Sequence, residues 1–269
     1  YDTAMSGDTI TEAWSASIDA GATFFDTAEV YGDGESERII GGLLAADPER
    51  AAKVQLATKF MPAPWKLNVR SALLASLRAS LERLGVERVE LYQIHGPVSL
   101  RGHGALAEAL AAAHQEGLVR AVGVSNYSVS ETKKFDAELR KRGLRLASNQ
   151  IEFSLLRTAP EKSGLLATCR DLGVVPLAYS PIGQGRLTGK YSASNPPPKT
   201  RNFSAHPMER VDDVVAELRR VGEANGGKTG PQVLDDLSWT AVEHVHMEVP
   251  ATTAEARALA TSLALRRGR

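Results

Sequence analysis

The feature that most constrains the fold is a strict alternation of two apolar patterns between residues 10 and 179. Short apolar runs typical of buried strands alternate with longer segments that have the apolar periodicity of helices. The expected order is helix 10–20, strand 24–26, helix 36–44, strand 54–59, helix 69–84, strand 89–95, helix 105–116, strand 119–124, helix 130–141, strand 146–150, helix 161–172 and strand 174–179. Because a helix follows each strand, the strands should run parallel with right-handed crossovers.

Beyond residue 179 the pattern becomes less regular. The segment that contains Asn195-Pro196-Pro197-Pro198 is too rich in proline for regular structure. We interpret 181–207 as an irregular loop that covers a cofactor, with a plain surface insertion as the alternative. A helix at 211–223, a helical segment from 232 to about 239, a short strand at 245–249 and a final helix from residue 254 are expected to follow.

This order of elements favours a (β/α)8 TIM barrel, an α/β fold, although only six clear strands and the short one are recognised. An open doubly wound sheet is the alternative. It would require a change in strand order and usually a Gly-rich first turn, and no G-x-G-x-x-G motif occurs at such a place. The barrel is therefore the predicted fold.

Polar side chains stand at or just after the ends of the predicted strands. Asp26 ends the run Phe24-Phe25, and Tyr31 follows five residues later. Lys59 and His95 end the next two strands. In a parallel barrel all such ends lie on one rim, where α/β folds usually place their chemistry. The sequence therefore predicts that these four side chains form one site.

The composition excludes several classes of partner. Lysine plus arginine equals aspartate plus glutamate, 32 residues each, so no overall charge attracts the protein to nucleic acid or anionic membrane. No apolar run approaches the roughly 18 residues of a membrane span, and no signal or transit sequence is visible. The single cysteine, Cys169, forms no internal disulfide and fits a reducing compartment. Small-molecule chemistry is favoured, and no metal is expected.

Six motifs occur in the order and spacing of the aldo-keto reductase superfamily, which the chain resembles from about Ile10 to Arg257. They are Asp26-Thr27-Ala28-x-x-Tyr31-Gly32, Ala57-Thr58-Lys59, Gln93-Ile94-His95-x-Pro97, Gly123-Val124-Ser125-Asn126, Asn149-Gln150 and Ala178-Tyr179-Ser180-Pro181. The resemblance implies one barrel domain over residues 1–269. It also places a first strand before Ile10, so we expect this strand to be missing from the chain and the full protein to be longer.

The same resemblance implies carbonyl reduction with NADP(H). Such a reaction needs a hydride donor, a proton donor and a group that stabilises charge on the carbonyl oxygen. Tyr31 would be the general acid, assisted by the Lys59 ammonium, which Asp26 would orient. His95 would donate a hydrogen bond to the carbonyl oxygen. A Schiff base on Lys59 is a weaker alternative.

Four strand-end residues have the chemistry to bind a nicotinamide, namely Ser125, Asn126, Gln150 and Tyr179. Hydroxyl and amide groups can bind a carboxamide, and an aromatic ring can stack on the nicotinamide. The resemblance further implies Ser180, Leu187 and Lys190 along the pyrophosphate, and Thr252 and Arg257 at the adenosine end. The usual acid and amide of that end are replaced by Ala260 and Thr261.

The segments Ala63-Pro64-Trp65, Ala147-Ser148-Asn149-Gln150 and Leu187-Thr188-Gly189-Lys190-Tyr191 are most similar to plastid members of plants and algae, including pyridoxal reductases. A pyridoxal-like aldehyde or ketone is therefore the expected substrate. A chloroplast location is expected from the resemblance, with the cytoplasm as the alternative. Met61 and Trp65 would line the substrate pocket. Another class of function is also open, because the missing first strand and the altered adenosine motif suit a weakly active or inactive barrel in a larger assembly.

Overall fold

A computed structural model describes residues 7–198 and 206–237 of the chain. Its sheet has six parallel strands in the order of the sequence. They are β1 (Phe24–Asp26), β2 (Gln55–Phe60), β3 (Val89–Ile94), β4 (Val119–Ser125), β5 (Leu146–Glu152) and β6 (Val175–Tyr179). Sequential order excludes a doubly wound sheet, in which the strand order changes direction. The predicted parallel α/β arrangement is confirmed.

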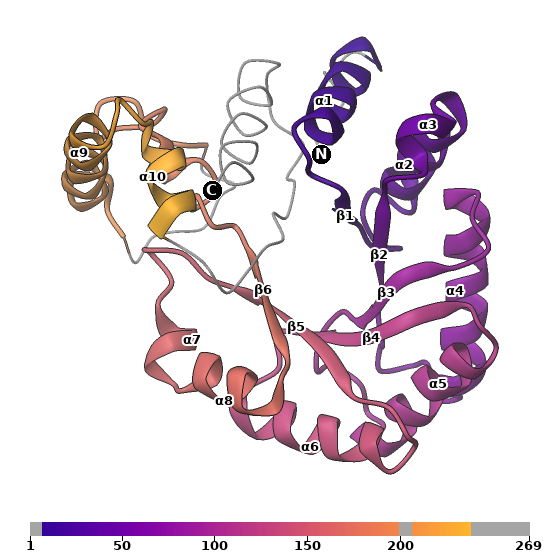
Figure 1. Cartoon of the computed structure of the whole chain (residues 1–269). Coiled ribbons are helices and arrows are strands. Elements are labelled where there is room, and N and C mark those ends of the chain that lie inside the picture. The colour runs from indigo at the N-terminus through magenta and orange to yellow at the C-terminus, as the bar shows by residue number, and fades with distance from the viewer. Residues whose placement is uncertain (1–6, 199–205, 238–269) are drawn as a thin grey trace.

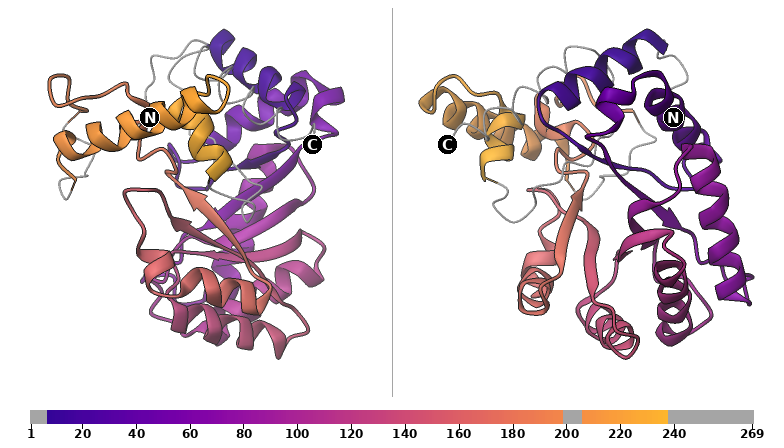
Figure 2. Two further views of the ribbon diagram at one scale, coloured as in Figure 1. Left: turned by 60° about the vertical axis from the view of Figure 1, so that its left-hand side comes forward. Right: turned by 45° about the vertical axis from the view of Figure 1, so that its right-hand side comes forward.

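Helices cover the outer side of this curved sheet, which forms half of a barrel (Figure 1). They are α1 (Gly7–Asp19), α2 (Glu35–Ala46), α3 (Pro48–Ala51), α4 (Val69–Leu84), α5 (His103–Gln115), α6 (Val129–Arg140), α7 (Ala159–Lys162) and α8 (Leu165–Leu172). A short 3-10 helix, η1 (Arg186–Thr188), and helices α9 (Met208–Ala224) and α10 (Gly230–Leu237) follow β6. Figure 2 shows α9 and α10 packed side by side beyond the end of β6.

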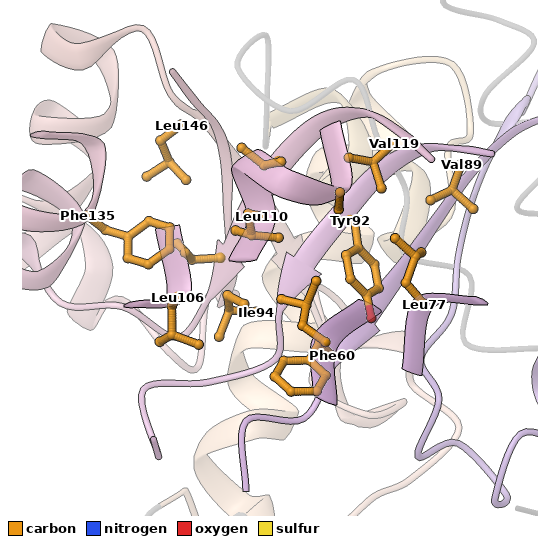
Figure 3. Close-up of a cluster of buried hydrophobic side chains, with 14 of the residues drawn as sticks. Phe60, Leu77, Val89, Tyr92, Ile94, Leu106, Leu110, Val119, Phe135 and Leu146 are labelled. Carbon is orange, nitrogen blue, oxygen red and sulfur yellow. The ribbon is translucent and has the colours of Figure 1, made fainter. Parts of the chain in front are cut away.

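The core lies between the sheet and the helices because alternate strand residues point to opposite faces. Tyr92 and Ile94 of β3 point outward and join Leu77 of α4 and Leu106 and Leu110 of α5 in one buried cluster (Figure 3). A second cluster joins η1 to α9 and α10. On the inner face, Ala57, Leu91 and Leu177 form a separate small layer. The strands are thus apolar on both faces, as the sequence pattern requires for a buried parallel sheet.

Some predicted element boundaries are wrong. The helix expected at 161–172 is broken into α7 and α8 because Gly164 adopts a left-handed conformation with φ 80°. Helix α2 runs from Glu35 to Ala46 instead of the expected 36–44, and its N-cap residue, Gly34, makes no side-chain hydrogen bond. The sequence interpretation did not recognise α3, whose N-cap Asp47 accepts a hydrogen bond from the Arg50 backbone.

The expected strand at 245–249 and the final helix lie outside the described residues. The segment 181–198 is irregular apart from η1, and residues 199–205 are not described. Among the helices in the described ranges, none has the length and apolar character needed to cross a membrane.

Candidate active site

Two buried charges stand at the ends of the first two strands. Lys59 of β2 donates a short hydrogen bond from Nζ to Oδ2 of Asp26, the last residue of β1. The same ammonium donates to the Thr27 carbonyl oxygen at 2.8 Å. The Lys59 side chain is fully buried, and only 2% of the Asp26 side chain is exposed. The parallel register pairs Asp26 with Ala57. Because Lys59 lies two residues after Ala57, the Asp26 and Lys59 side chains are on the same inner face of the sheet.

Tyr31 lies in the loop between β1 and α2, with its hydroxyl 3.5 Å from Lys59 Nζ. The ammonium also lies 5.0 Å from the centre of the tyrosine ring. Backbone hydrogen bonds fold the loop, because the Tyr31 N–H donates to the Ala28 oxygen at 3.0 Å and the Ser36 N–H donates to the Tyr31 oxygen at 3.3 Å. The phenol is therefore held above the ammonium by a compact turn.

His95 follows β3 and completes the group. Its backbone N–H donates to the Phe60 carbonyl oxygen at 2.8 Å, which extends the pairing between β2 and β3 by one residue. The imidazole lies edge-on to the Tyr31 ring, with 5.6 Å between ring centres. The structure thus brings together all four side chains that the strand-end argument selected.

The environment of Lys59 sets its protonation. Burial lowers the pKa of the Lys59 ammonium, because the charged form loses its hydration, while the Asp26 carboxylate acts in the opposite direction. The adjacent carboxylate keeps the cation paired, and removal of either charge would leave the other buried without its partner.

Gln93 is a member of this group that the sequence interpretation missed. It is fully buried on β3, at the register position beside Lys59. Its Nε2 donates to Oδ1 of Asp26 at 3.1 Å. The available signal was a glutamine that alternates with Leu91 on one face of the strand, two residues before His95.

A second group of polar side chains lies at the ends of β4, β5 and β6. The Tyr179 hydroxyl donates to Oδ1 of Asn126 at 2.9 Å, and the Asn126 amide donates to Oγ of Ser125 at 3.1 Å. Ser125 in turn donates to the backbone oxygen of Gln150 at 3.0 Å. Asn126 adopts a left-handed conformation with φ 61°, which turns the chain out of β4. Three strand ends are thereby joined by one chain of hydrogen bonds.

A comparison with known protein families identifies the family of this chain. Residues 2–261 match the model described as "Aldo/keto reductase family". The chain belongs to the aldo/keto reductase family. Members of this family are NADP-dependent oxidoreductases, so the expected class of enzyme and cofactor is confirmed at the level of the family.

Curated and solved relatives agree with this membership. The chain is 35% identical over 252 residues to the chloroplastic pyridoxal reductase of Arabidopsis thaliana, an alignment that covers 89% of this chain and 67% of that protein. A solved glycerol dehydrogenase from Gluconobacter oxydans is 25% identical with a TM-score of 0.80, covering 95% of this chain and 80% of that one.

An aldo/keto reductase from Klebsiella pneumoniae, solved in complex with NADP and acetate, shares the fold with a TM-score of 0.71 at 22% identity. That match covers 96% of this chain and 80% of the other. The chain spans 60 to 67% of the length of the first curated relatives that it matches. These relatives establish the family and the barrel fold.

The strand-end groups of this aldo/keto reductase fit the nicotinamide end of NADP(H). Gln150 is 4% exposed, and its side-chain amide makes no hydrogen bond within the part of the chain that the structure describes. Gln150 is not among the buried side chains with an atom that lacks a partner, so its amide can accept a ligand, and a carboxamide offers it both a donor and an acceptor. Asn149, by contrast, points away and bonds to the Tyr127 oxygen and the Thr132 hydroxyl, so it serves the fold.

The other residues expected at the cofactor have varied surroundings. The Leu187 side chain is fully buried in the second apolar cluster, and its N–H donates to the Ile182 oxygen at 3.1 Å. Ser180 is buried with a left-handed φ of 53°, whereas Lys190 is exposed beside the Tyr191 ring. Thr252 and Arg257 lie outside the described residues.

The two expected substrate-pocket residues lie in the loop after β2. Met61 is half-buried, and its N–H donates to Oε1 of Glu29 at 2.7 Å. Trp65 is 80% exposed, which is unusual for so large an apolar side chain. Within residues 7–198 and 206–237, no group of three or more His, Cys, Asp or Glu side chains is arranged to hold a metal ion.

Proposed function

We propose that this aldo/keto reductase reduces an aldehyde or ketone to the alcohol with NADPH, and that Tyr31 donates the proton. The observation that carries the proposal is the position of Lys59 Nζ, which lies between the Asp26 carboxylate and the Tyr31 hydroxyl, 3.5 Å from the latter. A cation in that place stabilises phenolate and so eases proton donation near neutral pH. The proton passes from the phenol to the carbonyl oxygen.

The remaining side chains would orient the reactants. His95, edge-on to Tyr31, would donate a hydrogen bond to the carbonyl oxygen and hold it near the phenol. Ser125, Asn126 and Gln150 would hold the carboxamide, and the Tyr179 ring would support the nicotinamide. When bound, NADPH supplies the hydride to the carbonyl carbon. Ser180, Leu187, Lys190, Thr252 and Arg257 stay proposed contacts of its pyrophosphate and adenosine.

For the substrate we propose a pyridoxal-like aldehyde. The support is the 35% identity to the Arabidopsis pyridoxal reductase, together with an exposed Trp65 on which an aromatic ring can stack. We further propose that residues 1–269 form one domain and that the protein works in a reducing compartment. The plant relative supports the chloroplast, whereas a relative from Escherichia coli has no such compartment. Microscopy of the fluorescently tagged full-length protein tests the compartment.

The decisive test compares the native protein with Tyr31→Phe. NADPH oxidation is followed by absorbance with a panel of aldehydes that includes pyridoxal, and NADPH binding is measured by fluorescence titration. Loss of the general acid should lower turnover by roughly 10²- to 10⁴-fold and leave NADPH binding within about threefold. Turnover that survives in Tyr31→Phe would remove Tyr31 as the acid.

The same titration separates the enzyme from a non-catalytic subunit of an assembly. Micromolar NADPH binding supports the enzyme, whereas no binding up to millimolar NADPH favours the subunit. The Schiff-base alternative is tested by borohydride trapping with pyridoxal. We expect no covalent adduct on Lys59, because its ammonium is fully buried and already donates to Asp26 and Thr27.

A further inference from the structure

Gln93 occupies the inner face of β3 between two other residues at the same level of the sheet. The register pairs it with Lys59 of β2 on one side and with Gly123 of β4 on the other. Gly123 is paired in turn with Ser148 of β5. Gln93 is fully buried, and Ser148 is 3% exposed. These four positions form one row across the sheet, level with the ammonium of Lys59.

The Gln93 amide links Asp26 of β1 with Ser148 of β5. Its Nε2 donates to Oδ1 of Asp26 at 3.1 Å, and its Oε1 accepts from Oγ of Ser148 at 3.3 Å. A carboxylate can only accept, so the nitrogen must face Asp26, and Ser148 holds the oxygen on the other side. The two carboxylate oxygens of Asp26 therefore have separate partners, Lys59 at Oδ2 and Gln93 at Oδ1.

Gly123 makes room for this bridge. A Cβ atom at this position would lie 2.3 Å from Ser148 Oγ and 3.0 Å from Gln93 Cγ. The first distance is shorter than real Cβ contacts and the second is tighter than most of them, so a side chain on β4 would displace the Ser148 hydroxyl and crowd Gln93. The glycine is required here by space, because it lets two side chains from β3 and β5 meet in front of β4.

We propose that Gln93, anchored by Ser148 across Gly123, is a positioning residue that fixes the Asp26 carboxylate and, through it, the Lys59 ammonium beneath Tyr31. The inference rests on the proposed role of Tyr31 as general acid. Gln93 itself does not touch the phenol in this scheme. Without it, Oδ1 of Asp26 loses this hydrogen bond, so the carboxylate is held less firmly and the ammonium at Oδ2 shifts relative to the phenol.

The test uses Gln93→Met, which keeps the side-chain length and removes the amide, and the milder Ser148→Ala, which removes only the anchor. The control is Tyr92→Leu, a change on the neighbouring residue that points to the helices and lowers stability without reaching the site. In Gln93→Met, kcat should fall about 10- to 100-fold, as expected for one lost hydrogen bond to a charged group. KM and NADPH binding should stay within about threefold, because nothing that binds substrate or cofactor changes.

Ser148→Ala alone should lower kcat by a smaller factor than Gln93→Met. Added to Gln93→Met, it should cause no further loss of kcat, because Ser148 acts only through the Gln93 amide. A second readout needs no turnover. The 13Cε resonance of Lys59, assigned with Lys59→Met, should shift in the cofactor-free Gln93→Met protein and stay in place in Tyr92→Leu.

An unchanged resonance with an unchanged kcat in Gln93→Met would overturn the positioning role while leaving the reductase intact. An equal loss of kcat in Tyr92→Leu would also overturn it, because the effect would then follow stability. If the resonance shifts in Gln93→Met but the native protein oxidises NADPH with none of the aldehydes, the positioning of the ion pair is supported and the proposed function fails.

Discussion

Glu37 and Arg83 form an ion pair on the helix-facing side of β2, with the Arg83 Nη2 and Nε atoms 2.6 Å and 2.7 Å from Oε2 of Glu37. Glu37 is fully buried, and its other oxygen accepts from the Thr58 hydroxyl at 2.5 Å. Thr58 immediately precedes Lys59. The pair therefore ties α2 and α4 to the back of the strand that carries the site lysine.

Breaking this pair should destabilise the whole protein. In Glu37→Gln the Arg83 guanidinium loses its counter-charge in a largely buried place, so we expect the free energy of unfolding to fall by about 3 to 5 kcal/mol. Urea denaturation followed by circular dichroism measures the change. The matched control is Glu35→Gln, which breaks an exposed pair with Arg38 and should cost about 0 to 1 kcal/mol. Equal losses in the two variants would contradict the structural role of Glu37.

Tyr179 carries a prediction about cofactor binding. Its ring is expected to support the nicotinamide, while its hydroxyl only holds the exposed Asn126 amide. Tyr179→Ala should therefore weaken NADPH binding roughly tenfold, the loss typical of one stacked aromatic ring. Tyr179→Phe should stay within about threefold of the native protein, because water can replace the hydroxyl at Asn126. Fluorescence titration measures both, and equal weakening would show that the hydroxyl, rather than the ring, carries the contact.

Trp65 carries a prediction about substrate selection. Because it is 80% exposed, Trp65→Ala should change the free energy of unfolding by no more than about 0.5 kcal/mol. If the indole stacks on an aromatic substrate, KM for pyridoxal should rise several-fold, corresponding to about 1 kcal/mol, while KM for a two-carbon aldehyde stays the same. Steady-state kinetics with both aldehydes provide the measurement. A KM that rises equally for both would remove Trp65 from the pocket wall.

Local signals explain why much of the fold was predictable. The expected helix 69–84 coincides with α4, because Asn68 accepts a hydrogen bond from the Ser71 N–H at one end and Gly85 adopts a left-handed φ of 68° at the other. Strand ends were visible to within two residues, because polar residues stand close to the ends of the apolar runs; β2, β3 and β5 end at Phe60, Ile94 and Glu152 rather than at Lys59, His95 and Gln150. The convergence of Asp26, Lys59 and His95 then followed from the rule that parallel strands end on the same rim.

What sequence reasoning missed depends on contacts between distant strands. In the sequence, Gln93 is only a polar residue within a predicted strand. The structure shows that the strand register places it beside Lys59 and Gly123 and that its amide reaches Asp26. The Glu37–Arg83 pair joins residues of α2 and α4 that are 46 positions apart in the sequence, so no local pattern indicates it. The break between α7 and α8 depends on the left-handed conformation of Gly164, because a glycine alone is compatible with a continuous helix.

Cys169 carries a prediction about alkaline stability. It is fully buried on α8, and burial raises the pKa of its thiol from 9.0 to about 11. Between these values the unfolded chain loses the thiol proton and the folded protein keeps it, so rising pH favours unfolding. The contribution of the Cys169 thiol to the free energy of unfolding is fully present below pH 9 and is lost as the pH rises towards 11. At pH 10 the loss should be about 1.4 kcal/mol.

Cys169→Ala should remove this contribution, so its free energy of unfolding should fall less between pH 8 and pH 10 than that of the native protein, by the same ~1.4 kcal/mol. Urea denaturation at each pH, with a reductant present, gives both slopes. Leu165→Ala, a cavity variant on the same helix, should lose stability at every pH and keep the native slope. If Cys169→Ala also keeps the native slope, the thiol ionises in the folded protein as easily as in the unfolded chain, and its burial does not control its proton.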